Sequence, residues 1–173
     1  MPQPGCSYFD TKLRRNDGLR SGKRLAIDVG SVRIGVAACD PDGILATPIA
    51  TVMRGAGDLG EIARLAAERE VIEVVVGLPT GLSGKAGKSA ADARAFAAAL
   101  ASEVAPAEVR LVDERFTTTL AHSALRSAGS DSRQRRSTVD KAAAALLLQS
   151  ALDSERLTGA PAGELVGAGT GDR

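Results

Sequence analysis

Aromatic side chains are almost absent from this 173-residue chain, which has no tryptophan, one tyrosine and three phenylalanines. Proteins that read single-stranded RNA commonly stack bases on such side chains. Tyr8 and Phe9 lie near the N-terminus, and Phe96 falls within an alanine-rich helical pattern that is typical of core. We therefore expect any nucleic-acid partner to be recognised through its backbone and shape more than through its base sequence.

Cysteine and histidine are equally scarce. Cys6 and Cys39 have no CxxC spacing, which excludes a cysteine zinc site and a disulfide framework. Cys39 ends an apolar run and is interpreted as a small core residue. The single histidine, His122, falls inside a predicted helix, so histidine-based acid–base or triad chemistry has little support.

Long apolar runs are missing too. None approaches the ~20 residues of a membrane helix, and the N-terminus shows no apolar core of a signal peptide. We therefore expect a cytoplasmic protein with no membrane partner. The net charge of +1 excludes a wholly basic polyanion binder, but residues 12–24 and 126–141 are basic clusters. These clusters fit either a phosphate backbone or solvated loops.

The apolar fraction of 44%, mostly Ala, Val, Leu and Ile, is enough for one sizeable core. Three β-type runs come first, and Asp40-Pro-Asp-Gly43 marks the turn between the second and third. Helical and strand patterns then alternate, which favours an α/β fold with a mixed five-stranded sheet flanked by helices on both faces. The predicted strands are 24–30, 33–39, 44–53, 71–77 and 109–113, and the predicted helices are about 57–69, 89–104, 117–128 and 139–157.

The two ends of the chain lack such periodicity. Residues 1–22 are predicted to be a disordered extension, residues 23–157 the folded domain, and residues 158–173 a disordered tail.

Acidic residues stand out at three separate places. Asp28 interrupts an apolar strand, where an ionised carboxylate is costly unless a cation or backbone amides meet it. Asp113 and Glu114 end the fifth strand, where function collects in open α/β sheets, although a salt bridge to a nearby arginine is the alternative. Asp140 opens the last predicted helix and is equally explained as a favourable charge at a helix N-terminus.

Taken together, these carboxylates favour a metal site. Oxygen ligands without Cys or His suit Mg²⁺ or Mn²⁺ rather than zinc. Two such ions about 4 Å apart activate water and stabilise the leaving oxygen in phosphodiester cleavage.

Four motifs resemble the YqgF/RuvX family of proposed pre-16S rRNA nucleases, which are similar in fold to RuvC-type Holliday junction resolvases. The resemblance covers about residues 24–153. In order, the motifs are Asp28-Val-Gly-Ser-Val-Arg-Ile-Gly35, Val76-Gly-Leu-Pro79 with Gly84, Asp113-Glu-Arg-Phe-Thr-Thr118 and Val139-Asp-Lys-Ala-Ala143.

This resemblance implies a ribonuclease-H-like fold and a Mg²⁺- or Mn²⁺-dependent nuclease. It implies that Asp28, Glu114 and Asp140 are the catalytic metal ligands, with Asp113 as the alternative to Glu114. Gly81 stands where the family often has Asn, which weakens any inference about substrate contact there. The basic residues expected to bind nucleic acid are Arg33, Lys85, Lys88, Arg115 and Lys141. A solvated surface charge is the alternative for Arg33, Lys85 and Lys88. The alternative role of Arg115 is to orient Glu114 and Asp113, and that of Lys141 is to tune the charge of Asp140.

The sequence is compatible with several functions. The leading hypothesis is a nuclease that processes the 5′ side of pre-16S rRNA. The alternative substrate is a four-way DNA junction, which requires a homodimer with paired sites. The segment from Asp28 to Gly35 also resembles the phosphate-binding hairpin of actin-like ATPases and sugar kinases. Those enzymes need two such domains around the nucleotide, and this chain has one such hairpin, so this function is disfavoured. A non-catalytic RNA- or ribosome-binding module is the most distant alternative.

Overall fold

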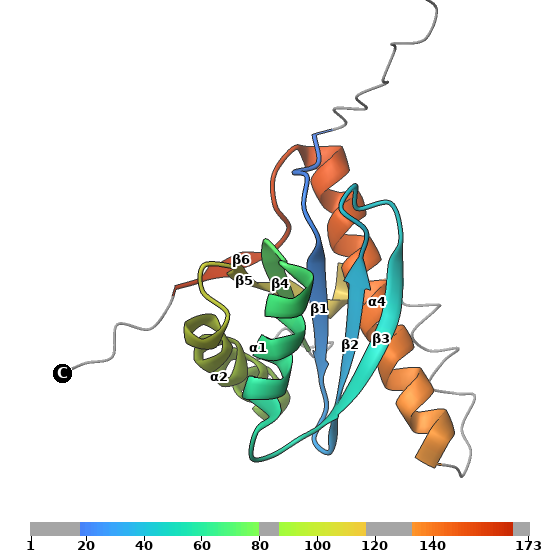
Figure 1. Ribbon diagram of the computed structural model, residues 1–173, viewed down its shortest axis with the longest axis vertical. Coiled ribbons are helices and arrows are strands. Elements are labelled where there is room, and N and C mark those ends of the chain that lie inside the picture. The colour runs from blue at the N-terminus through green and yellow to red at the C-terminus, as the bar shows by residue number, and fades with distance from the viewer. Residues whose placement is uncertain (1–17, 80–86, 117–132, 168–173) are drawn as a thin grey trace, which may run out of the picture.

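The computed structural model describes residues 18–79, 87–116 and 133–167. Within them, six strands form one mixed sheet in the order β3-β2-β1-β4-β5-β6 (Figure 1). The elements are β1 Arg24–Val29, β2 Arg33–Cys39, β3 Ala46–Met53, α1 Asp58–Arg69, β4 Glu73–Leu78, α2 Lys88–Glu103, β5 Glu108–Asp113, the 3₁₀ helix η1 Glu114–Phe116, α4 Arg133–Thr158 and β6 Glu164–Val166.

The first three strands, which correspond to the three predicted β-type runs, form an antiparallel meander. Its second turn is fixed by Asp40, whose carboxylate accepts hydrogen bonds from the backbone N–H groups of Asp42, Ile44 and Leu45. Strands β4 and β5 run parallel to β1. The three parallel strands therefore end on the same side, which we call the carboxyl end of the sheet.

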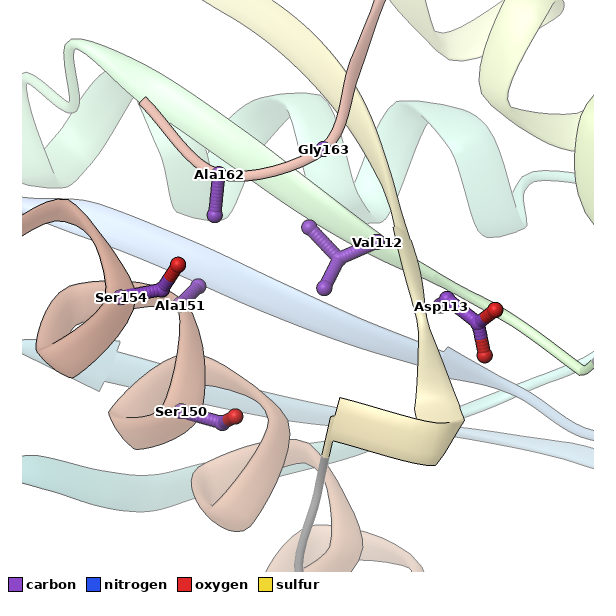
Figure 2. Close-up of a pocket in the computed structure, with 7 residues that line it drawn as sticks. All are labelled: Val112, Asp113, Ser150, Ala151, Ser154, Ala162 and Gly163. Carbon is purple, nitrogen blue, oxygen red and sulfur yellow. The ribbon is translucent and has the colours of Figure 1, made fainter. Parts of the chain in front are cut away.

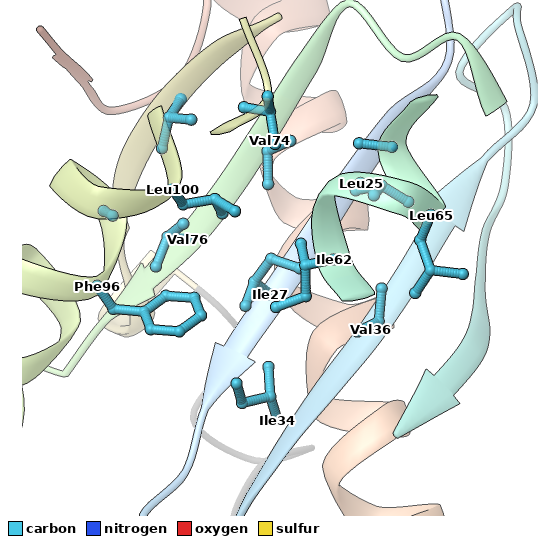
Figure 3. Packing of buried hydrophobic residues seen from close by; sticks show 14 of the residues in the cluster. Leu25, Ile27, Ile34, Val36, Ile62, Leu65, Val74, Val76, Phe96 and Leu100 are labelled. Carbon is cyan, nitrogen blue, oxygen red and sulfur yellow. The ribbon is translucent and has the colours of Figure 1, made fainter. Parts of the chain in front are cut away.

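Helices cover both faces of the sheet, as predicted: α1 and α2 lie on one face and α4 crosses the other (Figure 1). On the first face, Ile62 of α1 and Phe96 of α2 pack against β-strand residues such as Ile27 and Val76 (Figure 3). On the second face, three leucines of α4 pack against Ala26, Val75 and Val112. The apolar run of β4 is buried from Glu73 to Gly77, which confirms that it is covered on both sides.

Strand β6 differs from the prediction of a disordered tail after residue 157. It pairs antiparallel with β5, so that Val109 lies opposite Val166 and Leu111 opposite Glu164. This pairing covers an edge of the sheet that would otherwise expose unpaired backbone groups. The segment carries little strand signal because it is three residues long and follows a Gly- and Ala-rich stretch.

The last helix also starts earlier than predicted. Helix α4 begins at Arg133, not at residue 139, and continues for 26 residues to Thr158. The helix predicted for residues 117–128 lies outside the described residues, as do Cys6 and the glycines of the 80–86 segment. None of the helices in the described ranges is long and apolar enough to cross a membrane.

A buried ion-pair network lies at the other end of the sheet, where β1 and β4 begin. Glu155 of α4 accepts hydrogen bonds from Arg20 Nε at 2.8 Å and Arg24 Nη2 at 3.2 Å. Glu73 of β4 is paired with Arg20 and with Arg110. Residues 18–22, predicted to belong to the disordered extension, are thus attached to the domain through Arg20.

The charge balance of this network favours the ionised carboxylate. Burial acts to raise the pKa of Glu155, but the hydrogen bonds from Arg20 and the charge of Arg24 outweigh burial. The pKa of Glu155 is therefore lowered from its ordinary value of 4.5.

Candidate active site at the carboxyl end of the sheet

Asp28 lies near the end of β1, between two glycines on the neighbouring strands. It is directly opposite Gly35 of β2. On the other side Ile27 pairs with Val76 of β4, which brings Asp28 next to Gly77. Ala26, two residues earlier, packs in the cluster beneath α4, so strand alternation directs the half-buried Asp28 side chain to the same face.

Gly35 allows α4 to approach the sheet at this level. A Cβ atom at position 35 would lie only 2.1 Å from the backbone oxygen of Asp140 and 3.1 Å from the backbone nitrogen of Lys141. Because both atoms belong to the helix backbone, no side-chain rotation would relieve the clash. The absence of a side chain at Gly35 therefore places Asp140 of α4 beside the strand position of Asp28.

Gly77 plays the equivalent role for Glu114. A Cβ atom at position 77 would lie 3.1 Å from Glu114 Oε1 and 3.2 Å from Leu147 Cδ2. Glu114 begins η1 directly after β5, and its side chain turns back over β4. The carboxylate of Glu114 is thus held on the α4 face, one strand away from Asp28.

Asp113 is engaged differently. Its Oδ2 accepts from Arg115 Nη2 at 2.6 Å and from Arg115 Nε at 2.9 Å, and its Oδ1 accepts from the backbone N–H of Arg115. The hydrogen bond to Asp113 raises the pKa of Arg115. Asp113 is thus paired with Arg115, whereas Glu114 lies beside Gly77 on the α4 face, and this geometry favours Glu114 over Asp113 as the candidate ligand.

Asp140 lies well inside α4, not at its first turn, because the helix begins seven residues earlier. The expectation of a favourable helix N-terminus at Asp140 is therefore wrong. Its charge is met instead by Arg33 of β2, whose Nε donates to Asp140 Oδ2 at 3.0 Å. Arg33 is thus ion-paired and mostly buried, and not the solvated hairpin charge that was the alternative to a phosphate contact.

The three predicted ligands lie at the same end and on the same face of the sheet, but their side chains do not form a preformed metal site. Among the described residues, no group of three or more His, Cys, Asp or Glu is arranged to hold a metal ion. The donors nevertheless fit Mg²⁺ or Mn²⁺ in chemistry, since all are carboxylates. Gly35 and Gly77 also leave the positions on both sides of Asp28 without side chains.

The structure describes two further predicted basic residues besides Arg33 and Arg115. Lys88 is exposed at the first position of α2, and Lys141 is half-buried directly after Asp140. Lys85 lies outside the described residues.

Comparison with known proteins places this arrangement in a family. A family model described as "RuvX: Holliday junction resolvase" matches residues 22–154. The chain belongs to the RuvX family. Relatives from Nocardioides sp. and Thermobifida fusca are each 56% identical over 86% of this chain and 98% of their own length. Both carry the name "Putative pre-16S rRNA nuclease".

A solved structure supports the fold of this RuvX-family chain. RuvC of T. thermophilus, in complex with a Holliday junction substrate, aligns with a TM-score of 0.52 at 13% sequence identity. The alignment covers 81% of this chain and 98% of that chain. This likeness confirms the predicted ribonuclease-H-like class of fold, with six strands in place of five.

The RuvX-family chain also has a small cavity that the sequence did not indicate. It has a volume of about 110 Å³ and lies between β5, α4 and the segment that leads into β6 (Figure 2). Ser150 and Ser154 are one helical turn apart on α4, a spacing that places them on the same face of the helix. The lining residues are Val112, Asp113, Ser150, Ala151, Ser154, Ala162 and Gly163.

Proposed function

We propose that this RuvX-family chain is a Mg²⁺- or Mn²⁺-dependent nuclease that hydrolyses phosphodiester bonds at the 5′ end of pre-16S rRNA. One observation carries the proposal: Asp28 lies between two glycines, and each glycine admits a second acidic residue. Gly35 admits the backbone of Asp140, and Gly77 admits the side chain of Glu114. The names of the close relatives supply the substrate class.

Asp28, Glu114 and Asp140 would hold the divalent ions, which activate water and stabilise the leaving oxygen when bound. The protein side chains supply the remaining functions. Lys88 and Lys141 are cations suited to the phosphate backbone near the carboxyl end of the sheet. Lys85, which lies outside the described residues, is a third predicted contact. Arg115 holds Asp113 away from this role, which leaves Glu114 as the ligand after β5.

A Holliday junction is the second candidate substrate, and the description of the matching family model favours it. Cleavage of a junction requires two symmetric cuts, so this function predicts a homodimer with paired sites. The scarcity of aromatic residues fits either substrate, because both are recognised through backbone and shape.

The experiment compares cleavage of a labelled precursor RNA and a labelled four-way junction during parallel Mg²⁺ and Mn²⁺ titrations. We expect metal-dependent cleavage of the RNA by the wild type. Asp28→Asn should reduce the rate more than about 100-fold, because loss of even an outer-shell partner typically costs 10–100-fold. Asp42→Asn is the matched control, since Asp42 is an exposed turn residue outside the candidate site.

Each outcome separates the alternatives. Cleavage of the junction alone, by a dimer, would replace the RNA proposal with the second candidate. Binding of RNA without cleavage at any metal concentration would favour a non-catalytic module and overturn the proposal. An Asp28→Asn variant that cuts as fast as wild type would show that the metal ligands are assigned incorrectly.

A further inference from the structure

The backbone of Arg33 is held in the hairpin between β1 and β2 by hydrogen bonds. The backbone N–H of Gly30 donates to the carbonyl oxygen of Arg33 at 2.9 Å, and Val29 pairs with Ile34 directly after the turn. Arg33 is two residues before Gly35, so strand alternation places both on the face that α4 covers. Its side chain therefore leaves the sheet on the same side as that of Asp28.

Asp140, the ion-pair partner of Arg33, is also held in place by its backbone. Asp140 has its backbone against Gly35, within contact distance of β2. The bond from Arg33 Nε to Asp140 Oδ2 measures 3.0 Å, and the two side chains are only 17% and 32% exposed. This ion pair joins the hairpin to α4 across 107 positions of sequence, and it uses a carboxylate oxygen of a proposed metal ligand.

We propose that Arg33 is an exchangeable counter-ion: a divalent cation displaces it from Asp140, and the released guanidinium then binds a phosphate of the nucleic acid. This inference rests on the proposed function. A guanidinium and a divalent cation are both positive, so they compete for the same carboxylate oxygen. Phosphate is the natural second partner, because the guanidinium fork matches its oxygens.

The exchange has two measurable consequences with opposite signs. Arg33 opposes metal binding at Asp140, so its removal should tighten the affinity for the metal. Arg33 also supports substrate binding, so its removal should weaken the affinity for nucleic acid. A residue that merely stabilised the local fold would move both affinities in the same direction, because a misplaced Asp140 would impair metal binding as well.

The test measures Mn²⁺ binding to the full chain by titration calorimetry without nucleic acid, followed by the KM for the precursor RNA. In Arg33→Gln we expect the Kd for Mn²⁺ to fall about fivefold, the scale of a partly exposed ion pair. The KM for RNA should rise about tenfold through loss of a charged phosphate contact. Arg33→Lys keeps the charge and should lie between Arg33→Gln and wild type in both measurements.

Arg94→Gln is the matched control. Arg94 pairs with Glu164 at 3.1 Å on the exposed surface, so this variant removes the same charge from a similar ion pair elsewhere. It should leave both the Kd and the KM unchanged. Circular dichroism melts of all variants verify that the fold is retained.

The inference and the proposed function fail in different ways. If wild type binds Mn²⁺ but Arg33→Gln binds it with equal or lower affinity, the exchange is wrong and the nuclease proposal stands. If wild type does not bind Mn²⁺ and does not cleave either substrate, both fail together. If Arg94→Gln changes the Kd and the KM as much as Arg33→Gln does, the effect comes from the net charge of the protein alone, and the exchange is also wrong.

Discussion

Replacing Gly35 with alanine tests whether the close approach of α4 to β2 creates the candidate site. The added Cβ would lie 2.1 Å from the backbone oxygen of Asp140. Non-bonded heavy atoms settle at about 3.5 Å, so helix and strand must separate locally by about 1 Å or more. The obstacle is backbone, and therefore the displacement moves Asp140 itself.

Two magnitudes follow from this displacement. Overpacking of this kind costs about 1–3 kcal/mol, which for a chain of this size lowers the Tm by about 2–4 °C per kcal/mol. A misplacement of 1 Å in a catalytic group can reduce the rate about 100-fold. We therefore expect Gly35→Ala to remain folded, to melt several degrees lower, and to lose about two orders of magnitude in kcat.

The assay is a thermal melt together with steady-state cleavage of the preferred substrate. Gly60→Ala is the matched control, because a Cβ at Gly60 in α1 would meet nothing within 4 Å. Alanine in a helix interior should stabilise that variant by about 0.5–1 kcal/mol and leave cleavage unchanged. Wild-type stability and wild-type cleavage in Gly35→Ala would refute the close approach of α4 and the placement of Asp140 that depends on it.

Further predictions concern the ion-pair network and the acidic pair after β5. Glu155→Ala should lower the free energy of unfolding in urea by about 3 kcal/mol, because it removes the nearer carboxylate from the buried Arg24 and leaves it only Glu73, 3.6 Å from Arg24 Nε. Exposed Asp153→Ala should cost less than about 1 kcal/mol. The lowered pKa of Glu155 means that its stabilisation is complete above its ordinary value of 4.5 and is lost as the pH falls through the lowered pKa. Glu155→Gln should therefore flatten the acid side of a Tm-against-pH series, and an unchanged acid slope would contradict this. Glu114→Gln should abolish cleavage while Asp113→Asn keeps most of it, and the reverse order would reassign the ligand.

The features that could be predicted from the sequence are those with local causes. The apolar runs of β1 and β4, the Asp40 turn and the helical period of α1 each depend on neighbouring residues, and the structure contains them with nearly the predicted bounds. Asp28 could be placed because a charge within an apolar strand is conspicuous. Its position between Gly35 and Gly77 depends on strand register, which the local pattern does not specify.

The features that could not be predicted depend on contacts between distant segments. Asp113 and Glu114 are adjacent in sequence, and only the turn into η1 places Glu114 over Gly77 while Arg115 holds Asp113. The bond between Arg33 and Asp140 joins segments far apart in the chain and has no local signal. Strand β6 is likewise specified by the open edge of β5 rather than by its own residues.

The most direct test of the account is a crystal structure of the chain soaked in Mn²⁺, with data collected at the manganese absorption edge. We expect anomalous density bounded by carboxylate oxygens of Asp28, Glu114 and Asp140, with Arg33 turned away from Asp140. Manganese bound elsewhere, or none at millimolar concentration while Arg33 still holds Asp140, would contradict the metal-dependent mechanism.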